Sequence, residues 1–380
     1  NKLVRAGGIT IDGTPIPLSR VKTPTYVQAG REDHIAPAKS VWKITHHFQG
    51  PIRFVLAGSG HIAGVVNPPE AGKYQHWTNG KPEGDEADYI APEIDSVTLG
   101  EPDYVADIGT EYTPSPPGGG IDDYHCFIIE HDFTEDQFVN AFQVQAGDIS
   151  TVHHVLFWQI DKSVLPEARA KEATPGAGYT CFGGNGVGSE LGLLGGWVPG
   201  TVPVKFEDGQ GIRLPADSFI IVQIHYNTIN GTSPDRTKIE MHFTDGPATT
   251  PLGMYPMPAT DLFVAAGDAN GEAGVEYRLP IGTTVYGMVP HMHMLGTRIR
   301  VQAGDQCLID IPDWDFNWQG FYLYDTPVPV AAGATLKLEC WYDNSAANQP
   351  NGRTPQNVTW GEGTYDEMCL NYFIIEELPF

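Results

Sequence analysis

Three histidine-bearing segments carry the side chains best suited to chemistry in this 380-residue sequence. His153 and His154 are adjacent in TVHHVLFW, His225 lies in VQIHYN, and His291 and His293 are two residues apart in VPHMHMLG. Because alternate side chains of a strand share a face, His291 and His293 can bind one metal ion together. His153 and His154 can do so only at a strand end or a bulge.

Each of these segments also has a purely structural interpretation. A lone His225 is typical of a core or surface residue, and a His-x-His pair arises easily by chance among 13 histidines. Three such segments on predicted strands of an acidic chain favour a metal site. Imidazole ligands suit copper or zinc, and a thioether among them selects copper, because soft sulfur favours Cu(I). Met368 in DEMCLNYF could supply that thioether; the alternative is a methionine that fills a gap in the core.

The segments that must position these side chains have the pattern of β-structure. From residue 122 onward, short alternating stretches such as HHVLFWQI, SFIIVQIHY and ATLKLECWY are separated by Gly, Pro, Asp and Asn turns. Helical periodicity is nearly absent outside 163–173. This pattern is typical of antiparallel β-sandwiches. We expect two tandem antiparallel β-sandwiches, at 122–248 and 249–380, because about 260 residues suit two sandwiches better than one.

The first 80 residues have a different pattern. TPTYVQAG and IRFVLAG predict two short buried strands, and the apolar residues between them fall at helical spacing. We expect an incomplete α/β-hydrolase-like segment over 1–80. It is too small to fold alone, since a parallel sheet needs covering on both faces. Residues 81–121 are rich in Gly, Pro and acid, and we expect a linker there.

The charge changes sign along the chain. Residues 1–82 contain 10 Lys and Arg against 4 Asp and Glu, whereas residues 83–380 contain 12 against 43. This break indicates two pieces of different origin or environment. The net charge of −25 disfavours nucleic acid and anionic membranes as partners. No apolar run approaches the roughly 20 residues that a membrane-spanning helix needs.

The five cysteines do not form a CxxC pair, which argues against a zinc ribbon or a thioredoxin-like site. They are Cys126, Cys181, Cys307, Cys340 and Cys369. Two disulfides and one leftover thiol fit an oxidising compartment. Five buried thiols are the alternative.

Four ordered motifs resemble the copper type II, ascorbate-dependent monooxygenases, which include peptidylglycine α-hydroxylating monooxygenase and dopamine β-monooxygenase. The motifs are HH at 153–154, QIHY at 223–226, HMHMLG at 291–296 and DEMC at 366–369. The resemblance covers about 100–380, and YHCFII and DFNWQ look like the bacterial members. The resemblance implies two jelly-roll-like β-sandwich domains that face a solvent cleft.

The resemblance also implies two copper ions per chain. An electron-transfer copper would be held by His153, His154 and His225. An oxygen-binding copper would be held by His291, His293 and Met368. Ascorbate would reduce both ions, and an oxidoreductase of this kind would hydroxylate a substrate C–H with dioxygen. We therefore expect a small-molecule substrate, dioxygen and an electron donor as partners.

Other positions qualify the resemblance. Gln223 matches a family residue near the first copper, and Tyr372 matches a tyrosine on the substrate side of the peptide enzymes. Val289 stands where those enzymes carry an arginine that grips a carboxylate, and Leu370 stands where they carry an asparagine. We therefore reject peptide amidation and leave the substrate open.

The resemblance implies a disulfide pairing as well. Cys340 and Cys369 would pair and brace the methionine ligand. Cys126 and Cys181 are the candidates for a second pair, although the partner that the animal enzymes have for a cysteine at 126 is not seen here. Cys307 would be left over.

A second resemblance covers residues 1–79. GREDHIAP (30–37) and VLAGSGHIAGVVNPP (55–69) look like the C-terminal end of polyhydroxyalkanoate synthase. In that family the matching residues, Asp33 and His61, would serve a cysteine nucleophile that precedes them in the chain. No cysteine precedes Cys126 here. A triad without its nucleophile cannot perform covalent acyl transfer, so we expect Asp33 and His61 to be vestigial.

The two resemblances imply different compartments. Copper domains with disulfides would be periplasmic or extracellular, whereas a genuine synthase segment would be cytoplasmic. We hypothesise a chimeric reading frame joined near 77–85 and a natural N terminus upstream of Asn1. The rival functions are a polyester synthase fragment that releases coenzyme A from a thioester, and a copper carrier without catalytic activity.

Overall fold

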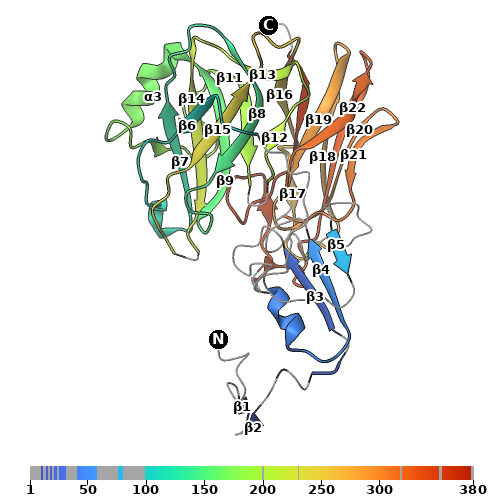
Figure 1. The fold of residues 1–380 in the computed structure, drawn as a ribbon. Helices are drawn as coiled ribbons and strands as arrows, with labels where there is room; N and C mark the ends of the chain where they lie inside the picture. The colour runs from blue at the N-terminus through green and yellow to red at the C-terminus, as the bar shows by residue number, and fades with distance from the viewer. Residues whose placement is uncertain are drawn as a thin grey trace. The chain divides into compact units, whose positions relative to one another are not determined.

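The computed structural model divides into two compact units, Asn1–Ser96 and Val97–Phe380, which are described separately. It describes residues 10–11, 14–15, 18, 21–23, 25–30, 41–57, 76–79, 99–198, 201–229, 231–316, 319–350 and 353–377. Strands dominate these residues, and they form several sheets (Figure 1). The predicted mainly-β sandwich class is confirmed. No helix among the described residues is long and apolar enough to cross a membrane.

The first unit contains a small three-stranded sheet. Strands β3 (Thr25–Gly30) and β4 (Ile52–Ala57) pair in parallel, as expected for an α/β segment, and β5 (His76–Asn79) pairs antiparallel with β4. Between β3 and β4 lies the 3₁₀ helix η2 (Lys43–His46). A separate short hairpin is formed by β1 (Thr10–Ile11) and β2 (Thr14–Pro15). Asp33 and His61, the predicted vestigial pair, lie outside the described residues.

In the second unit, a five-stranded antiparallel sheet carries the first histidines. Its order is β10-β7-β14-β9-β11, with bounds β7 (Asp122–Ile129), β9 (Val152–Asp161), β10 (Tyr179–Thr180), β11 (Glu190–Trp197) and β14 (Ser218–Asn227). The central strand β14 is buried along almost its whole length, because its neighbours cover both edges and packed side chains cover both faces. The helices η6 (Lys162–Val164) and α3 (Leu165–Lys171) follow β9.

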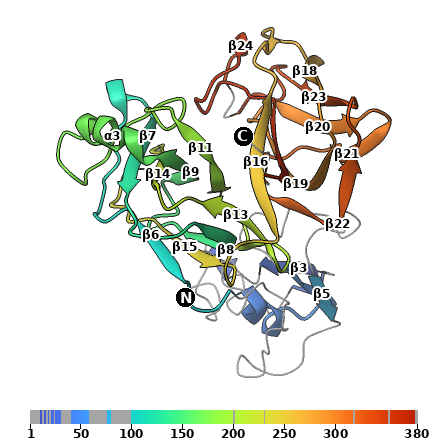
Figure 2. The ribbon, with the colours of Figure 1, turned by 90° about the horizontal axis from the view of Figure 1, so that it is seen from above.

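A nine-stranded sheet runs through the whole second unit. Its order is β22-β19-β25-β16-β13-β8-β15-β6, and β12 pairs with β8. The bounds are β6 (Tyr104–Asp107), β8 (Gln137–Gln145), β12 (Val204–Lys205), β13 (Gln210–Leu214), β15 (Lys238–Phe243), β16 (Thr250–Pro258), β19 (Thr283–His291), β22 (Tyr322–Val330) and β25 (Leu370–Glu376). The parallel pair β13–β16 joins its two parts (Figure 2).

We call residues 99–248 the first half and residues 249–377 the second half. The predicted boundary at 248/249 falls just before β16, and it stays a prediction because the sheet continues across it. The expected linker 81–121 contains β6, which pairs with β15, and the short 3₁₀ helix η5 (Pro117–Gly119).

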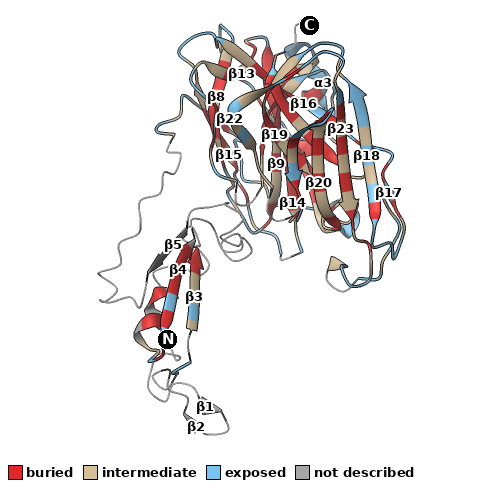
Figure 3. Cartoon of the chain, turned by 90° about the vertical axis from the view of Figure 1, so that its right-hand side faces the viewer, coloured by how far each residue is buried: buried red, intermediate tan, exposed pale blue. Residues whose placement is uncertain are grey.

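A four-stranded antiparallel sheet completes the second half. Its order is β18-β23-β20-β21, with bounds β18 (Gly271–Arg278), β20 (Gly296–Ala303), β21 (Gln306–Ile311) and β23 (Thr335–Tyr342). The short strands β17 (Phe263–Val264) and β24 (Val358–Thr359) pair beside it. One hydrophobic core lies mostly in the first half but includes Leu252, Met254 and Ile374 of the second half, and another lies within the second half. Figure 3 shows buried residues along β9, β14, β19, β20 and β23.

Two disulfides connect these sheets to neighbouring segments, and they join the two candidate cysteine pairs named from the sequence. Cys126 on β7 is bonded to Cys181, and Cys340 on β23 is bonded to Cys369, which directly precedes β25. The second disulfide therefore ties the residue after Met368 to the four-stranded sheet. Cys307 is free and exposed.

Candidate metal centres

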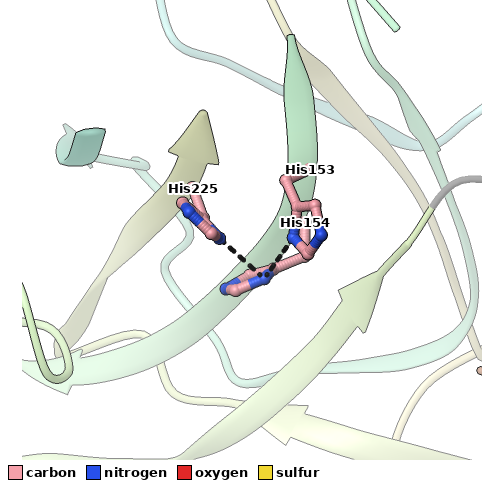
Figure 4. A group of neighbouring side chains, drawn as sticks. All are labelled: His153, His154 and His225. Atoms are coloured by element: carbon pink, nitrogen blue, oxygen red, sulfur yellow. Dashed lines mark hydrogen bonds between the residues drawn. The ribbon is translucent and has the colours of Figure 1, made fainter. Parts of the chain in front are cut away.

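The first three histidines meet at the end of the five-stranded sheet. His153 and His154 follow the first residue of β9, and His225 lies opposite His154 on β14, next to a register shift. This is the strand-end setting that two adjacent histidines need to face one site. One nitrogen from each of the three rings lies within 4.8 Å of the others. The Nδ1 atom of His154 is 3.4 Å from those of His153 and His225 (Figure 4).

The outer hydrogen bond of His225 determines which of its nitrogens faces the cluster. Its Nε2–H donates to Asp122 Oδ1 at 2.9 Å. A neutral imidazole carries one N–H, so the lone pair of His225 is on Nδ1, which points at His154. Tyr124 stacks on the His225 ring at 4.0 Å and holds its plane. The Nδ1 atoms of the three rings therefore converge, and His225 offers the lone pair of its Nδ1 to a cation bound among them.

The second set lies where β19 ends. His291 is the last residue of that strand, and the His293 ring lies 5.0 Å from it, nearly perpendicular. The Nδ1–H of His291 donates to Gln319 Oε1, and the Nδ1–H of His293 donates to the carbonyl of Asp366 at 2.9 Å. Both Nε2 atoms are thus left with their lone pairs. The second set therefore offers Nε2 atoms to a metal ion, whereas in the first set His225 offers Nδ1.

A buried carboxyl group ties the second histidine segment to the methionine segment. Glu367 accepts hydrogen bonds from the backbone N–H of His293 at 3.0 Å and of Leu295 at 2.7 Å. Burial raises the pKa of Glu367 to about 8, although these N–H donors oppose the shift. Met368, the next residue, is buried, and the Tyr342 hydroxyl donates to its carbonyl at 2.8 Å. Through Glu367, these hydrogen bonds connect the backbone at His293 to the segment that carries Met368.

One cavity of about 310 Å³ contains all six predicted ligands in its wall. They are His153, His154, His225, His291, His293 and Met368. Most of the remaining wall is apolar, as with Leu156, Trp158, Leu193, Trp197, Phe321 and Trp360. Carboxyl groups of Glu190 and Glu362 also line it, but no lysine or arginine does among the described residues.

The other two predicted site residues also line this cavity. Gln223 donates from Nε2 to the carbonyls of Cys181 at 2.9 Å and Gly184 at 2.7 Å. It thereby anchors the loop at one edge of the cavity, and its role beside a copper stays a prediction. Burial raises the pKa of Tyr372, so its phenol is neutral.

Burial keeps the histidines neutral. Removal from water and, to a smaller extent, the neighbouring imidazoles together lower the pKa of His153 and of His293 to about 3. The pKa of His154 is lowered in the same way. A metal cation binds only the neutral imidazole ring. These histidines are already neutral at pH 7, so they do not need to lose protons before they bind a metal.

These pKa values predict how the stability of the metal-free protein depends on pH. The unfolded chain takes up protons on His153 and His293 near pH 6.5, and the folded chain does not. The contribution of these two histidines to the free energy of unfolding is therefore complete above pH 6.5 and is lost as the pH falls. Each contributes at most about 1.4 kcal/mol per pH unit. The raised pKa of Glu367 has the opposite effect, because its contribution to the free energy of unfolding is lost as the pH rises.

We therefore expect the double variant His153→Gln/His293→Gln to lose less unfolding free energy than the wild type between pH 7.5 and 5.5. Urea unfolding of both metal-free proteins at the two pH values measures this. An equal loss in the two proteins would show that these rings titrate normally.

Asp122 links the two halves at the first set. Besides His225, its Oδ1 accepts from Thr364 Oγ1 at 2.7 Å, and Thr364 lies in the second half. Burial alone would raise the pKa of Asp122, but the hydrogen bonds from His225 and Thr364 lower it below its usual value. The carboxylate therefore stays charged and holds the proton of His225 on Nε2.

Asp122→Asn is expected to weaken metal binding at the first set by roughly 10- to 100-fold, since it removes the charge that orients His225. Copper titration followed by electron paramagnetic resonance (EPR) measures each set separately. Asp107→Asn is the matched control, because Asp107 pairs with Arg236 at the surface. Equal affinities in all three proteins would contradict this role.

The sequence did not identify several partners of the ligands. Asp122, Gln319 and Glu367 all hold a predicted ligand in place, as does the carbonyl of Asp366. Gln319 lies in the motif DFNWQ, and Glu367 lies in DEMC. Their position within a motif was therefore the sequence signal that could have identified them as partners of the ligands. A backbone carbonyl has no sequence signal.

Comparisons with known proteins support both resemblances. Residues 269–375 match the family model for the copper type II ascorbate-dependent monooxygenase, C-terminal domain. The DBH-like monooxygenase protein 1 of Homo sapiens is 23% identical over 259 residues, which cover 61% of this chain and 40% of that protein. The second half is thus similar to the C-terminal domain of copper type II ascorbate-dependent monooxygenases.

A stretch of 79 residues in the chain has different relatives. The poly(3-hydroxyalkanoate) polymerase subunit PhaC of Rhizobium meliloti (strain 1021) is 56% identical over 79 residues, 21% of this chain and 13% of that protein. The chain therefore spans a small part of the length of these polymerases. Among solved structures, that of Sulfolobus Turreted Icosahedral Virus aligns with a TM-score of 0.30 and 9% identity over 73% of this chain and 89% of that chain, which supports no functional argument.

Proposed function

We propose that Val97–Phe380 is a copper-dependent monooxygenase that hydroxylates a substrate C–H with dioxygen and ascorbate, or another one-electron donor. The observation that carries this proposal is that two chemically different ligand sets line one cavity. A carrier needs only one kind of set. The apolar wall between and around the sets leaves room for a substrate beside both.

The donor atoms fit copper at both sets. His153, His154 and His225 would hold one ion by nitrogen alone, as suits an ion that changes charge without changing ligands. His291, His293 and Met368 would hold the other, and their thioether favours Cu(I), the form that meets dioxygen. Copper bound here supplies the one-electron chemistry that activates dioxygen.

The protein groups around the ligands orient them and exclude water. Asp122 keeps a proton on Nε2 of His225, while Gln319 keeps one on Nδ1 of His291. The apolar wall excludes water from the reacting C–H bond. Because Val289 is part of this wall and no described cation is, a substrate carboxylate has no charged partner. This supports the rejection of peptide amidation.

The two disulfides favour a periplasmic or extracellular site of action for the copper domains. The polymerase alternative has less support. The match to those enzymes covers 79 residues, or 21% of this chain, whereas both ligand sets lie in Val97–Phe380.

The test is copper analysis followed by oxygen-uptake measurements with ascorbate and a panel of benzylic, amine and aliphatic substrates. We expect two copper ions per chain and uptake that depends on one class of substrate and matches the yield of hydroxylated product. Two bound copper ions without substrate-dependent uptake would favour the carrier. Release of coenzyme A from a hydroxyacyl thioester would favour the polymerase.

A further inference from the structure

Phe316 lies between the two ligand sets. Its ring stacks on His153 with centroids 5.3 Å apart and planes at 28°, and it meets His293 edge-on at 6.0 Å and 83°. His153 belongs to β9 in the first half, whereas Phe316 lies between β21 and β22 in the second half. The same side chain therefore contacts one predicted ligand of each set, and the two imidazoles cannot be farther apart than the sum of these distances.

The position of Phe316 is fixed from both sides. Its carbonyl accepts a hydrogen bond from Gln319 Nε2 at 2.8 Å, and the Oε1 atom of the same amide accepts from His291. Further along this segment, the Phe321 ring packs edge-on against Phe142 of the first half, with centroids 5.6 Å apart. The segment is thus held at a ligand of the second set and at the core of the first half.

We propose that Phe316 is a positioning residue that keeps the two metal ions apart and prevents a small anion from bridging them. This inference rests on the proposed function, because it requires copper at both sets. A phenyl ring has neither a donor nor an acceptor, so it fills the space between two imidazoles without competing for the metal. Without the ring, the imidazoles of His153 and His293 would face the vacated space, which would fill with water or an anion.

The separation has a chemical purpose in the proposed reaction. Two copper ions that share a bridging ligand behave as one coupled centre, whereas the different ligands of the two sets suit ions with different tasks. Phe316 would preserve that difference by occupying the path between His153 and His293. The ring also belongs to the cavity wall, so it limits how deep a substrate can reach between the sets.

The test uses the Cu(II)-loaded protein and sodium azide as the bridging probe. In the wild type, we expect all bound copper to give an EPR signal with and without azide. In Phe316→Ala, we expect azide to remove most of that signal, since a bridged pair of Cu(II) ions is magnetically coupled. Trp197→Ala is the matched control, because Trp197 is an aromatic residue that lines the same cavity from β11, outside the segment that carries Phe316.

Copper stoichiometry, measured first, distinguishes the possible failures. A wild type with fewer than two copper ions would overturn the proposed function and this inference with it. Two copper ions, together with an azide response that is the same in Phe316→Ala and the wild type, would overturn the role of Phe316 alone. Phe316→Leu keeps an apolar side chain in place and should show a smaller loss of signal than alanine, so the test survives if the alanine variant does not fold.

Discussion

Met368→Ala is expected to abolish substrate hydroxylation while the copper on the three-histidine set stays bound. The substitution removes the only thioether proposed as a ligand and leaves the second copper two imidazoles, which stabilise Cu(I) less well. Copper content should fall from two ions per chain towards one under ascorbate. Metal analysis of the reduced protein and product formation measure the two effects.

A second cavity methionine provides the control for that experiment. Met254 also lines the cavity and is buried, but we assign it no metal. Met254→Ala should keep both copper ions and the hydroxylation reaction, although it can change the affinity for substrate. Unchanged turnover in Met368→Ala would show that the thioether is a packing residue, which is the alternative that the sequence alone leaves open.

His225→Ala is expected to remove the first copper and to reduce hydroxylation to the background rate. His225 contributes one of the three converging nitrogens and is the ring that Asp122 orients. The second set should keep its copper, because its hydrogen bonds come from Gln319 and Asp366. Copper analysis and the EPR spectrum of the Cu(II) protein identify which ion is lost.

His242→Ala is the matched control for His225→Ala, since His242 lies on β15 and is not part of the cavity wall. Both variants lose one imidazole, so a general effect of histidine loss would appear in both. Two copper ions with normal coupling of oxygen uptake to product in His225→Ala would refute its assignment as a ligand.

The sequence predicted the strands better than their pairing. Alternating residues around His225 and around Cys340 identified β14 and β23, because a two-residue period is a local property. The parallel pair β13–β16, which lets one sheet run through both halves, is a long-range contact without a local signal. The four residues of β6 were missed for the same reason, since that edge strand is defined by β15.

The same distinction applies to the site. Histidine and methionine are residue types with recognisable metal chemistry, so the candidate ligands could be proposed from the sequence. Their partners could not, because Asp122 and Thr364 are far apart in the chain and meet only after both halves fold. Phe316 is an ordinary aromatic residue in the sequence, and only its contacts with His153 and His293 distinguish it.

The most direct test of this account is an anomalous difference map, collected at the copper absorption edge, from crystals of the copper-loaded protein. We predict two peaks. One should lie among the Nδ1 atoms of His153, His154 and His225, and the other should lie between the Nε2 atoms of His291 and His293 and the sulfur of Met368. A single peak, or a second peak away from Met368, would contradict the account.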